Sequence, residues 1–301
     1  MSRPLRLLSQ NMFIRPPGIS NSGNDFKDER LEYLLENYAK EYDVLCFMEM
    51  FQFGSNRHSN FIKKCTELGF KYHVASPPKG LFSLGIDAGL LILSKYPILQ
   101  NEFIQYARGV HSDALSLKGA LYAKVQIPGQ AENGTAAEQG DAAGGDNNYT
   151  LHLFATHTQA SYGQIDKAQK SIEVRAKQLA TLSKFIISTL EKHQGSEKEP
   201  VLLVGDMNVD SRAHVLGDYP YEIDERDGKE SSAEYLRMID ILSGKTSETS
   251  GSSLKQNRLF VTDVLYKALD YHPVTSGATR YDEENKKVVP LDPQWIKSQD
   301  F

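Results

Sequence analysis

The stretch Leu203-Val204-Gly205-Asp206-Met207-Asn208 decides how the rest of the sequence is interpreted. It is an apolar run that stops on an acid and an amide one residue apart. Because a β-strand alternates its faces, we expect Asp206 and Asn208 to point the same way, at the strand end where α/β folds place their chemistry. A carboxylate beside a carboxamide suits a hard cation or a phosphoryl oxygen better than it suits core packing.

The bulk composition sets limits on the class of protein. With 301 residues, 40% hydrophobic and 24% charged, the chain can bury a large core and is typical of a globular domain. Its net charge of −5 provides no basic surface, which makes nucleic acid an unlikely partner. Cys46 and Cys65 are predicted to be buried free thiols in a reducing compartment.

The amino terminus has no apolar signal segment, and no apolar run approaches the roughly 20 residues that a membrane-spanning helix needs. We therefore expect a cytoplasmic protein without a transmembrane segment, whose contact with membranes is peripheral.

Apolar spacing predicts a chain in which strands and helices alternate. Helices are expected at 28–39, 56–68 and 165–193, and strands at 5–12, 44–48, 89–93, 120–127, 150–156 and 200–204. The apolar stripe of the longest helix is expected to pack on a sheet. The chain is expected to become irregular after Pro273. This order favours a layered α/β fold with mixed sheets.

The segment at about 130–148 is rich in Gly, Ala, Asp, Glu and Asn and nearly lacks large apolar residues. Such a composition cannot bury enough surface to order itself. We interpret it as a flexible, low-complexity hairpin insertion inside a single domain that covers residues 1–301.

Three more polar residues stand at the ends of apolar runs. Asn11 follows an alternating run, where it either caps a turn or belongs to a site. Glu49 follows one of the most apolar stretches of the chain, where an acid is costly unless it is bound to a metal or to a structural ion-pair partner. His157 ends the run 150–156, whereas His152 on the same strand is expected to be structural. Asparagine, acid and histidine side chains from four strands suit Mg²⁺-assisted attack of water on a phosphodiester.

These motifs resemble a known family. The chain contains, in the order of the endonuclease/exonuclease/phosphatase superfamily, Ser9-Gln10-Asn11, Phe47-Met48-Glu49, Thr156-His157-Thr158-Gln159 and Gly205-Asp206-Met207-Asn208. The resemblance covers about residues 5 to 280 and implies a four-layer α/β/β/α sandwich of two packed mixed β-sheets. Further segments resemble the neutral sphingomyelinase subgroup, namely those that begin at Asp87, Leu117, Thr158 and His272.

The resemblance implies roles for individual residues. Glu49 and Asn11 would hold the metal, Mg²⁺ or alternatively Mn²⁺. Asp206 and Asn208 would orient the attacking water and bind phosphate, and His157 would contact the scissile phosphate. Lys118 would supply positive charge for substrate binding, with a solvated lysine at a strand edge as the alternative.

One departure from the family concerns its closing Ser-Asp-His motif, whose histidine is the usual general base. No Asp-His pair follows Asn208 in this sequence. A truncated gene product, a splice form and an inactive relative are the three explanations, and truncation is favoured. The fold is accordingly expected to be incomplete at its carboxyl end.

The resemblance implies a hydrolase of sphingolipid metabolism that converts sphingomyelin to ceramide and phosphocholine at a membrane surface. Residues 81–84 would form a loop that dips into the bilayer, or else pack in the core. An endonuclease or inositol-polyphosphate phosphatase of the same fold is the alternative, and a catalytically impaired lipid- or protein-binding relative is a third.

Overall fold

A computed structural model describes residues 4–19, 25–78, 86–129, 148–161, 165–212, 229–245, 259–273, 275, 279–282 and 287–290. The chain divides into two compact units, the first comprising Met1–His157 and Ser188–Met207, the second Thr158–Ile187 and Asn208–Phe301. The loop at 81–84 and, except for Asn148, the insertion at 130–148 lie outside the described residues. A single domain over residues 1–301 stays a prediction.

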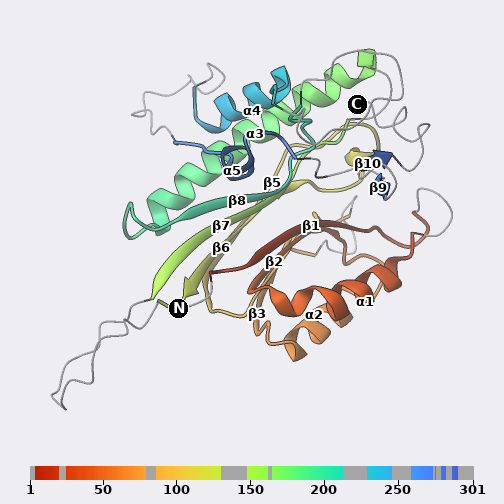
Figure 1. Ribbon diagram of the computed structural model, residues 1–301, viewed down its shortest axis with the longest axis vertical. Helices are drawn as coiled ribbons and strands as arrows, with labels where there is room; N and C mark the ends of the chain where they lie inside the picture. The colour runs from red at the N-terminus through yellow and green to blue at the C-terminus, as the bar shows by residue number, and fades with distance from the viewer. Residues whose placement is uncertain are drawn as a thin grey trace. The chain divides into compact units, whose positions relative to one another are not determined.

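The first unit contains two four-stranded mixed sheets (Figure 1). The first sheet has the order β1 (Leu7–Ile14), β2 (Val44–Met50), β4 (Leu91–Ser94), β3 (Tyr72–Ala75), with only β1 and β2 parallel. The second has the order β5 (Ile98–Gln105), β6 (Gly119–Ile127), β7 (Tyr149–His157), β8 (Val201–Asp206), with only β7 and β8 parallel. A turn of 3₁₀ helix, η2 (His111–Ala114), precedes β6.

Apolar side chains fill the space between these sheets because alternate residues of each strand face inward. Val44, Cys46 and Met48 of β2 belong to the same buried cluster as Leu121 and Ala123 of β6. Leu151 and Leu153 of β7 complete it, and Leu202 and Val204 of β8 pack against it.

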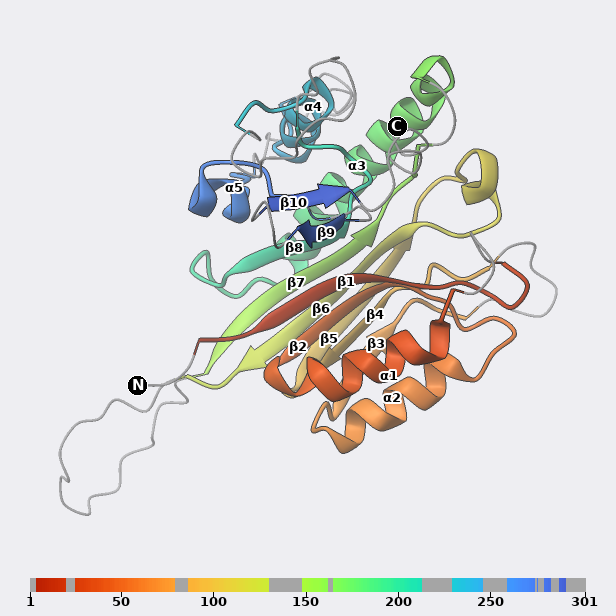
Figure 2. The same cartoon turned by 45° about the vertical axis from the view of Figure 1, so that its right-hand side comes forward.

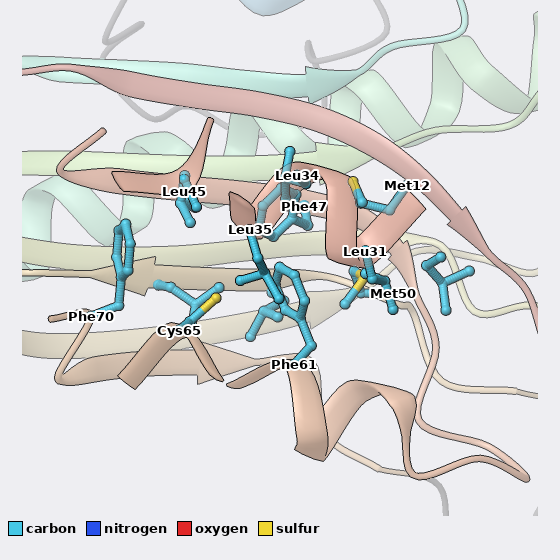
Figure 3. Close-up of a cluster of buried hydrophobic side chains, with 14 residues drawn as sticks. Met12, Leu31, Leu34, Leu35, Leu45, Phe47, Met50, Phe61, Cys65 and Phe70 are labelled. Atoms are coloured by element: carbon cyan, nitrogen blue, oxygen red, sulfur yellow. The ribbon is translucent and has the colours of Figure 1, made fainter. Parts of the chain in front are cut away.

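Two helices, α1 (Lys27–Asn37) and α2 (Arg57–Glu67), cover the other face of the first sheet (Figure 2). Leu45 and Phe47 of β2 pack there against Leu31 of α1 and Phe61 of α2 (Figure 3). The Phe47 and Phe61 rings meet edge to face, 5.5 Å apart. Both faces of β2 are covered, which agrees with its continuously apolar sequence from Val44 to Met48. Two mixed sheets with helices confirm the predicted α/β class.

Helix α3 (Ile165–His193) has the predicted bounds. It belongs to the second unit as far as Ile187, and its last turn belongs to the first unit. There Lys124 of β6 donates to the His193 carbonyl at 2.6 Å, and the Tyr122 ring stacks with His193.

The second unit also holds α4 (Ala233–Leu242), α5 (Val264–Leu269) and a hairpin of β9 (Thr279–Asp282) with β10 (Lys287–Pro290). The expectation of irregular chain after Pro273 is therefore wrong. Inside this unit, the buried Arg175 of α3 donates to Glu234 of α4 at 2.7 Å.

Other differences from the expected elements are local. The sequence did not predict β3 or β5, which are short or half-exposed strands with a weak apolar pattern. Cys46 and Cys65 are buried free thiols, as predicted. Within the described residues, we find no helix that combines the length and the hydropathy needed to cross a bilayer.

Candidate functional site

Strand alternation directs three of the predicted site residues into the space between the two sheets of the first unit. On β7 and β8, inward-facing Leu153 and Val204 precede His157 and Asp206 by an even number of residues. His157 and Asp206 are also direct neighbours in the parallel register. Asn11 follows the inward-facing Leu7 of β1 by four residues. All three therefore lie between the sheets, His157 and Asp206 as the last residues of their strands and Asn11 three residues before the end of β1.

Glu49 is the exception, because alternation would direct it toward α1 and α2 together with Leu45 and Phe47. Instead Glu49 adopts the left-handed conformation, with φ of 54°. The irregularity resets the alternation, so that the next residue, Met50, packs in the helix-side cluster. This strained backbone turns the Glu49 carboxylate to the inter-sheet side, where Asn11 and His157 lie.

Asn11 links two carboxylates. Its Nδ2 donates to Oε1 of Glu49 at 3.2 Å and to Oδ2 of Asp206 at 2.9 Å. Its Oδ1 accepts a hydrogen bond from the backbone N–H of Phe13 at 3.1 Å, which fixes the orientation of the amide. Asn11 therefore does more than cap a turn, because it holds the two acids at one point.

Lys118 enters this cluster from the segment before β6. Its Nζ lies 2.6 Å from Nε2 of His157 and 3.5 Å from Oδ1 of Asp113 in η2. Lys118 is 5% exposed, so the alternative of a solvated lysine at a strand edge is wrong. Asp113, which is also buried, had no signal in the sequence, because only the fold brings its segment to Lys118.

His157 is held as a neutral imidazole. An ammonium can only donate, so Nε2 of His157 accepts from Lys118 and the ring proton resides on Nδ1. Burial, followed by the charge of Lys118, lowers the pKa of His157 far below its usual value, although Asp206 opposes the shift. Nε2 lies 3.8 Å from Asp206 and 4.0 Å from Glu49, but an uncharged ring forms no ion pair with either acid.

The chemistry of Glu49 fits a metal ligand. Burial raises the pKa of this carboxyl, against the effects of Lys118 and the Asn11 hydrogen bond. Its Oε2 is buried and makes no hydrogen bond with any residue that the structure describes. An uncompensated buried oxygen is costly unless a cation satisfies it.

In the described part of the chain, no group of three or more His, Cys, Asp or Glu side chains is arranged around a metal position. The cluster offers two carboxylates and an amide, which suits Mg²⁺, an ion that binds through one or two carboxylates and keeps several waters.

Asn208 differs from the expectation in one respect. β8 ends at Asp206, and Asn208 has φ of 49°, so strand alternation does not extend to it. Its Nδ2 donates to the Thr158 carbonyl at 3.0 Å, within the second unit. The prediction that Asp206 and Asn208 lie on one face of a strand is therefore wrong, because β8 ends at Asp206.

The glycine of the Gly205-Asp206 motif is required by close packing. A Cβ added at Gly205, whose φ is 135°, would lie 2.0 Å from the backbone oxygen of Thr156. Only glycine lets β8 approach β7 this closely. The glycine at position 205 therefore allows the close approach of β8 to β7 that places Asp206 beside His157.

Comparisons with known proteins agree with this architecture. No protein-family model matches the chain. A sphingomyelinase of Dictyostelium discoideum is 26% identical over an alignment of 406 positions, which covers 100% of this chain and 82% of the relative. Sphingomyelinase C of Bacillus cereus is 27% identical and covers 69% of this chain, which spans 54% of that relative. A beta toxin variant from Staphylococcus aureus, solved with bound magnesium ions, matches with a TM-score of 0.55 and 21% identity over 79% of this chain and 70% of that one.

The fold and the sequence relatives define the same class of protein. The structural match shows the α/β fold of two mixed sheets, and the relatives are sphingomyelinases. The chain is thus similar to sphingomyelinases in sequence and in fold, in agreement with the resemblance that the four sequence motifs carry.

Proposed function

We propose that the chain is a Mg²⁺-dependent phosphodiesterase that hydrolyses sphingomyelin to ceramide and phosphocholine. The observation that carries the proposal is Glu49, a buried carboxylate that strained backbone turns toward Asn11 and Asp206, with one oxygen left for a cation. Hydrolase relatives that act on sphingomyelin support the substrate.

Glu49 and Asn11 would hold the metal, and Asp206 would complete the group of oxygen ligands and orient the attacking water. Bound there, Mg²⁺ would neutralise phosphoryl oxygens and acidify water. A beta toxin solved with bound magnesium ions supports this choice of ion. Asn208 would bind a phosphoryl oxygen through its amide.

Lys118 and His157 would recognise the scissile phosphate as a unit. Lys118 uses one proton on Nε2 of His157 and has further donors for a phosphoryl oxygen. The neutral His157 orients the ammonium, and its Nδ1, which is buried and makes no hydrogen bond within the described residues, carries a proton. Preorganised donors of this kind stabilise the charge that develops in a phosphoryl transition state.

His272 of the second unit does not replace the histidine of the family's closing motif in this proposal. Among the described residues, His272 is the histidine that follows the Asp206 motif, and its Nε2 bonds with Ser231 at 2.9 Å inside the second unit. Glu49-dependent turnover is the activity that we expect from this chain.

Phosphocholine release from sphingomyelin, measured with and without Mg²⁺, tests the proposal. Wild type should release phosphocholine only with the metal, and Glu49→Gln should lose that release while it folds normally. Asn37→Asp, which changes an exposed residue of α1 outside the cluster, is the control. Phosphocholine release by Glu49→Gln at the wild-type rate would contradict the metal-site proposal.

Assays with other substrates, run beside the sphingomyelin assay, separate the alternative functions. Cleavage of DNA, or release of phosphate from inositol polyphosphates, in place of phosphocholine release would identify another phosphodiester hydrolase of this fold. Absence of all three activities, with retained vesicle binding, would identify an impaired lipid-binding relative. We expect the cytoplasm as the location and a membrane surface as the place of action.

A further inference from the structure

A buried arginine of α3 has contacts that the proposed reaction does not use. Arg175 is only 1% exposed, and its guanidinium joins three segments of the second unit. Its Nε donates to Oε1 of Glu234 at 2.7 Å, its Nη1 to the carbonyl of Gln159 at 2.5 Å and its Nη2 to Oγ of Ser161 at 3.0 Å. Replacing a buried ion pair by apolar residues is often neutral for stability, so packing alone does not explain a charge at this position.

Gln178, which lies on the same face of α3 because it is three residues further along the helix, binds the same residue as Arg175. Its Oε1 accepts a hydrogen bond from the N–H of Gln159 at 2.7 Å. Side chains of α3 therefore hold both the N–H and the carbonyl of Gln159, and all three residues are buried. We call Arg175 and Gln178 the arginine–glutamine clamp.

The clamp holds the peptide group that binds Asn208. The carbonyl of Thr158 accepts from Nδ2 of Asn208 at 3.0 Å, and this carbonyl belongs to the same peptide group as the N–H of Gln159. Because a peptide group is planar, a bond at its N–H end fixes the direction of its oxygen. Gln178 therefore holds one end of the plane whose other end binds the Asn208 amide.

The segment that follows Asn208 is tied to the same framework through α4, which lies beside α3 in both views (Figures 1 and 2). Ser232, the N-cap of α4, donates from Oγ to the carbonyl of Asp210 at 2.5 Å. Two residues further on, Glu234 accepts from Arg175. Asn208 is thus enclosed by a ring of contacts in which α3 holds the segment before it in space and α4 holds the segment after it in sequence.

The backbone of Asn208 shows why such a ring is needed. Its φ of 49° is left-handed, and a conformation of this kind persists where the surrounding structure determines it. Since Nδ2 gives one of its two protons to Thr158, the position of that peptide sets the orientation of the whole amide. We propose that the arginine–glutamine clamp is a positioning device that holds the Thr158–Gln159 peptide and so orients the Asn208 amide for a phosphoryl oxygen of the substrate. The benefit to turnover rests on the proposed function.

Gln178→Met removes the acceptor for the Gln159 N–H without leaving a charge unpaired. Per folded molecule, kcat for phosphocholine release should fall about 10- to 100-fold while KM changes less than about threefold, because the amide acts on charge that develops in the transition state. Gln178→Glu keeps an acceptor oxygen and loses only Nε2, which makes no hydrogen bond within the described residues. It should therefore keep kcat within about threefold of wild type. Lys177→Met, at an exposed neighbouring position of α3, is the control.

A double variant decides whether the clamp acts through Asn208. Added to Asn208→Ala, Gln178→Met should lower kcat by less than a further factor of about two, because the interaction that it would impair is already lost. Two losses that multiply would show that the clamp supports the fold or another group, and the proposal would be wrong. A wild-type kcat for Gln178→Met or for Asn208→Ala would also overturn it.

Nuclear magnetic resonance of the Asn208 side-chain amide, without metal or substrate, keeps this inference apart from the proposed function. The two amide protons, assigned by the loss of their signals in Asn208→Ala, should exchange with water about tenfold faster in Gln178→Met than in wild type or Lys177→Met. Arg175→Lys keeps a charge beside Glu234 but cannot bind three partners at once, so it should act in the same direction.

Unchanged exchange in both Gln178→Met and Arg175→Lys would refute the positioning role, whatever the activity. Faster exchange in a protein whose wild type hydrolyses no sphingomyelin would leave the positioning role standing and refute the sphingomyelinase proposal.

Discussion

Two buried histidines on β7, five residues apart, have opposite environments. His152 is fully bonded, since its Nδ1 pairs with the Tyr122 hydroxyl at 2.8 Å and its Nε2 with Glu199 at 2.9 Å. His157 bonds through Nε2 to Lys118, and its buried Nδ1 makes no hydrogen bond with a described residue. An odd spacing places the two rings on opposite faces of the strand.

The two histidines differ in whether the buried polar groups around them are hydrogen-bonded. Around His152, polar groups satisfy one another, and Glu199 also accepts from the N–H of Gly195 at 2.7 Å. Around His157, the Glu49 backbone is strained and one carboxylate oxygen has no bond within the described residues. A buried polar group that is satisfied stabilises the fold, whereas one that is not satisfied is typical of a site awaiting a ligand.

The largest expected effect is on activity at the His157 end. His157→Gln should reduce phosphocholine release about 100- to 1000-fold, because it removes the group that orients Lys118 toward the phosphate. The free energy of unfolding should fall by only about 1–3 kcal/mol, because buried Lys118 loses its hydrogen bond to Nε2 of His157. Turnover and urea denaturation measure the two quantities. Normal turnover would show that His157 has no role in the reaction.

Two glycine variants, one near His157 and one near His152, compare the two regions by their effect on the free energy of unfolding. Gly205→Ala should destabilise the protein by at least about 2 kcal/mol, because its Cβ would meet backbone atoms of Thr156 at 2.0 Å and its φ is positive. Gly195→Ala, beside Glu199, should cost less than about 1 kcal/mol, because the nearest atom is a side-chain oxygen at 3.3 Å. Thermal unfolding of both variants gives the comparison, and equal losses would contradict it.

His152→Leu should affect stability and spare the chemistry. It leaves the Tyr122 hydroxyl and the Glu199 carboxylate without their His152 hydrogen bonds, which should cost about 1–3 kcal/mol. Activity per folded molecule should stay within about threefold of wild type. Denaturation midpoints and turnover corrected for the folded fraction test both parts. A variant that is stable but inactive would reverse the roles assigned to the two histidines.

The smallest effect concerns acid stability at the His152 end. Burial raises the pKa of Glu199, but the His152 hydrogen bond and the Gly195 N–H outweigh it, so the pKa lies below its usual value. The folded state therefore gains stability above the pKa of the unfolded chain and loses it as pH falls through the folded pKa.

Glu199→Gln should weaken this acid-side dependence by less than about 1 kcal/mol, since the carboxylate is partly exposed. Free energies of unfolding at neutral and acid pH provide the measurement. A variant whose pH dependence grows steeper below pH 5 would contradict the assigned direction.

The fold was predictable where apolar periodicity is strong. β2 and α3 carry long, regular patterns, and α3 begins and ends at the predicted residues. β3 and β5 were missed because half-exposed strands give weak patterns, and the β9–β10 hairpin was missed because strands of four residues are too short to show a periodic pattern. Pairing with a neighbour forms these strands, and local sequence does not record the neighbour.

The sequence by itself determined which side chains of a strand share a face, because alternation with period two follows from the chain alone. Asn11, His157 and Asp206 meet on that basis. Tertiary structure alone decided that Glu49 would turn toward them through a left-handed backbone and that buried Lys118 would bond His157. Those outcomes depend on packing and desolvation between segments distant in sequence, and no local pattern encodes such forces.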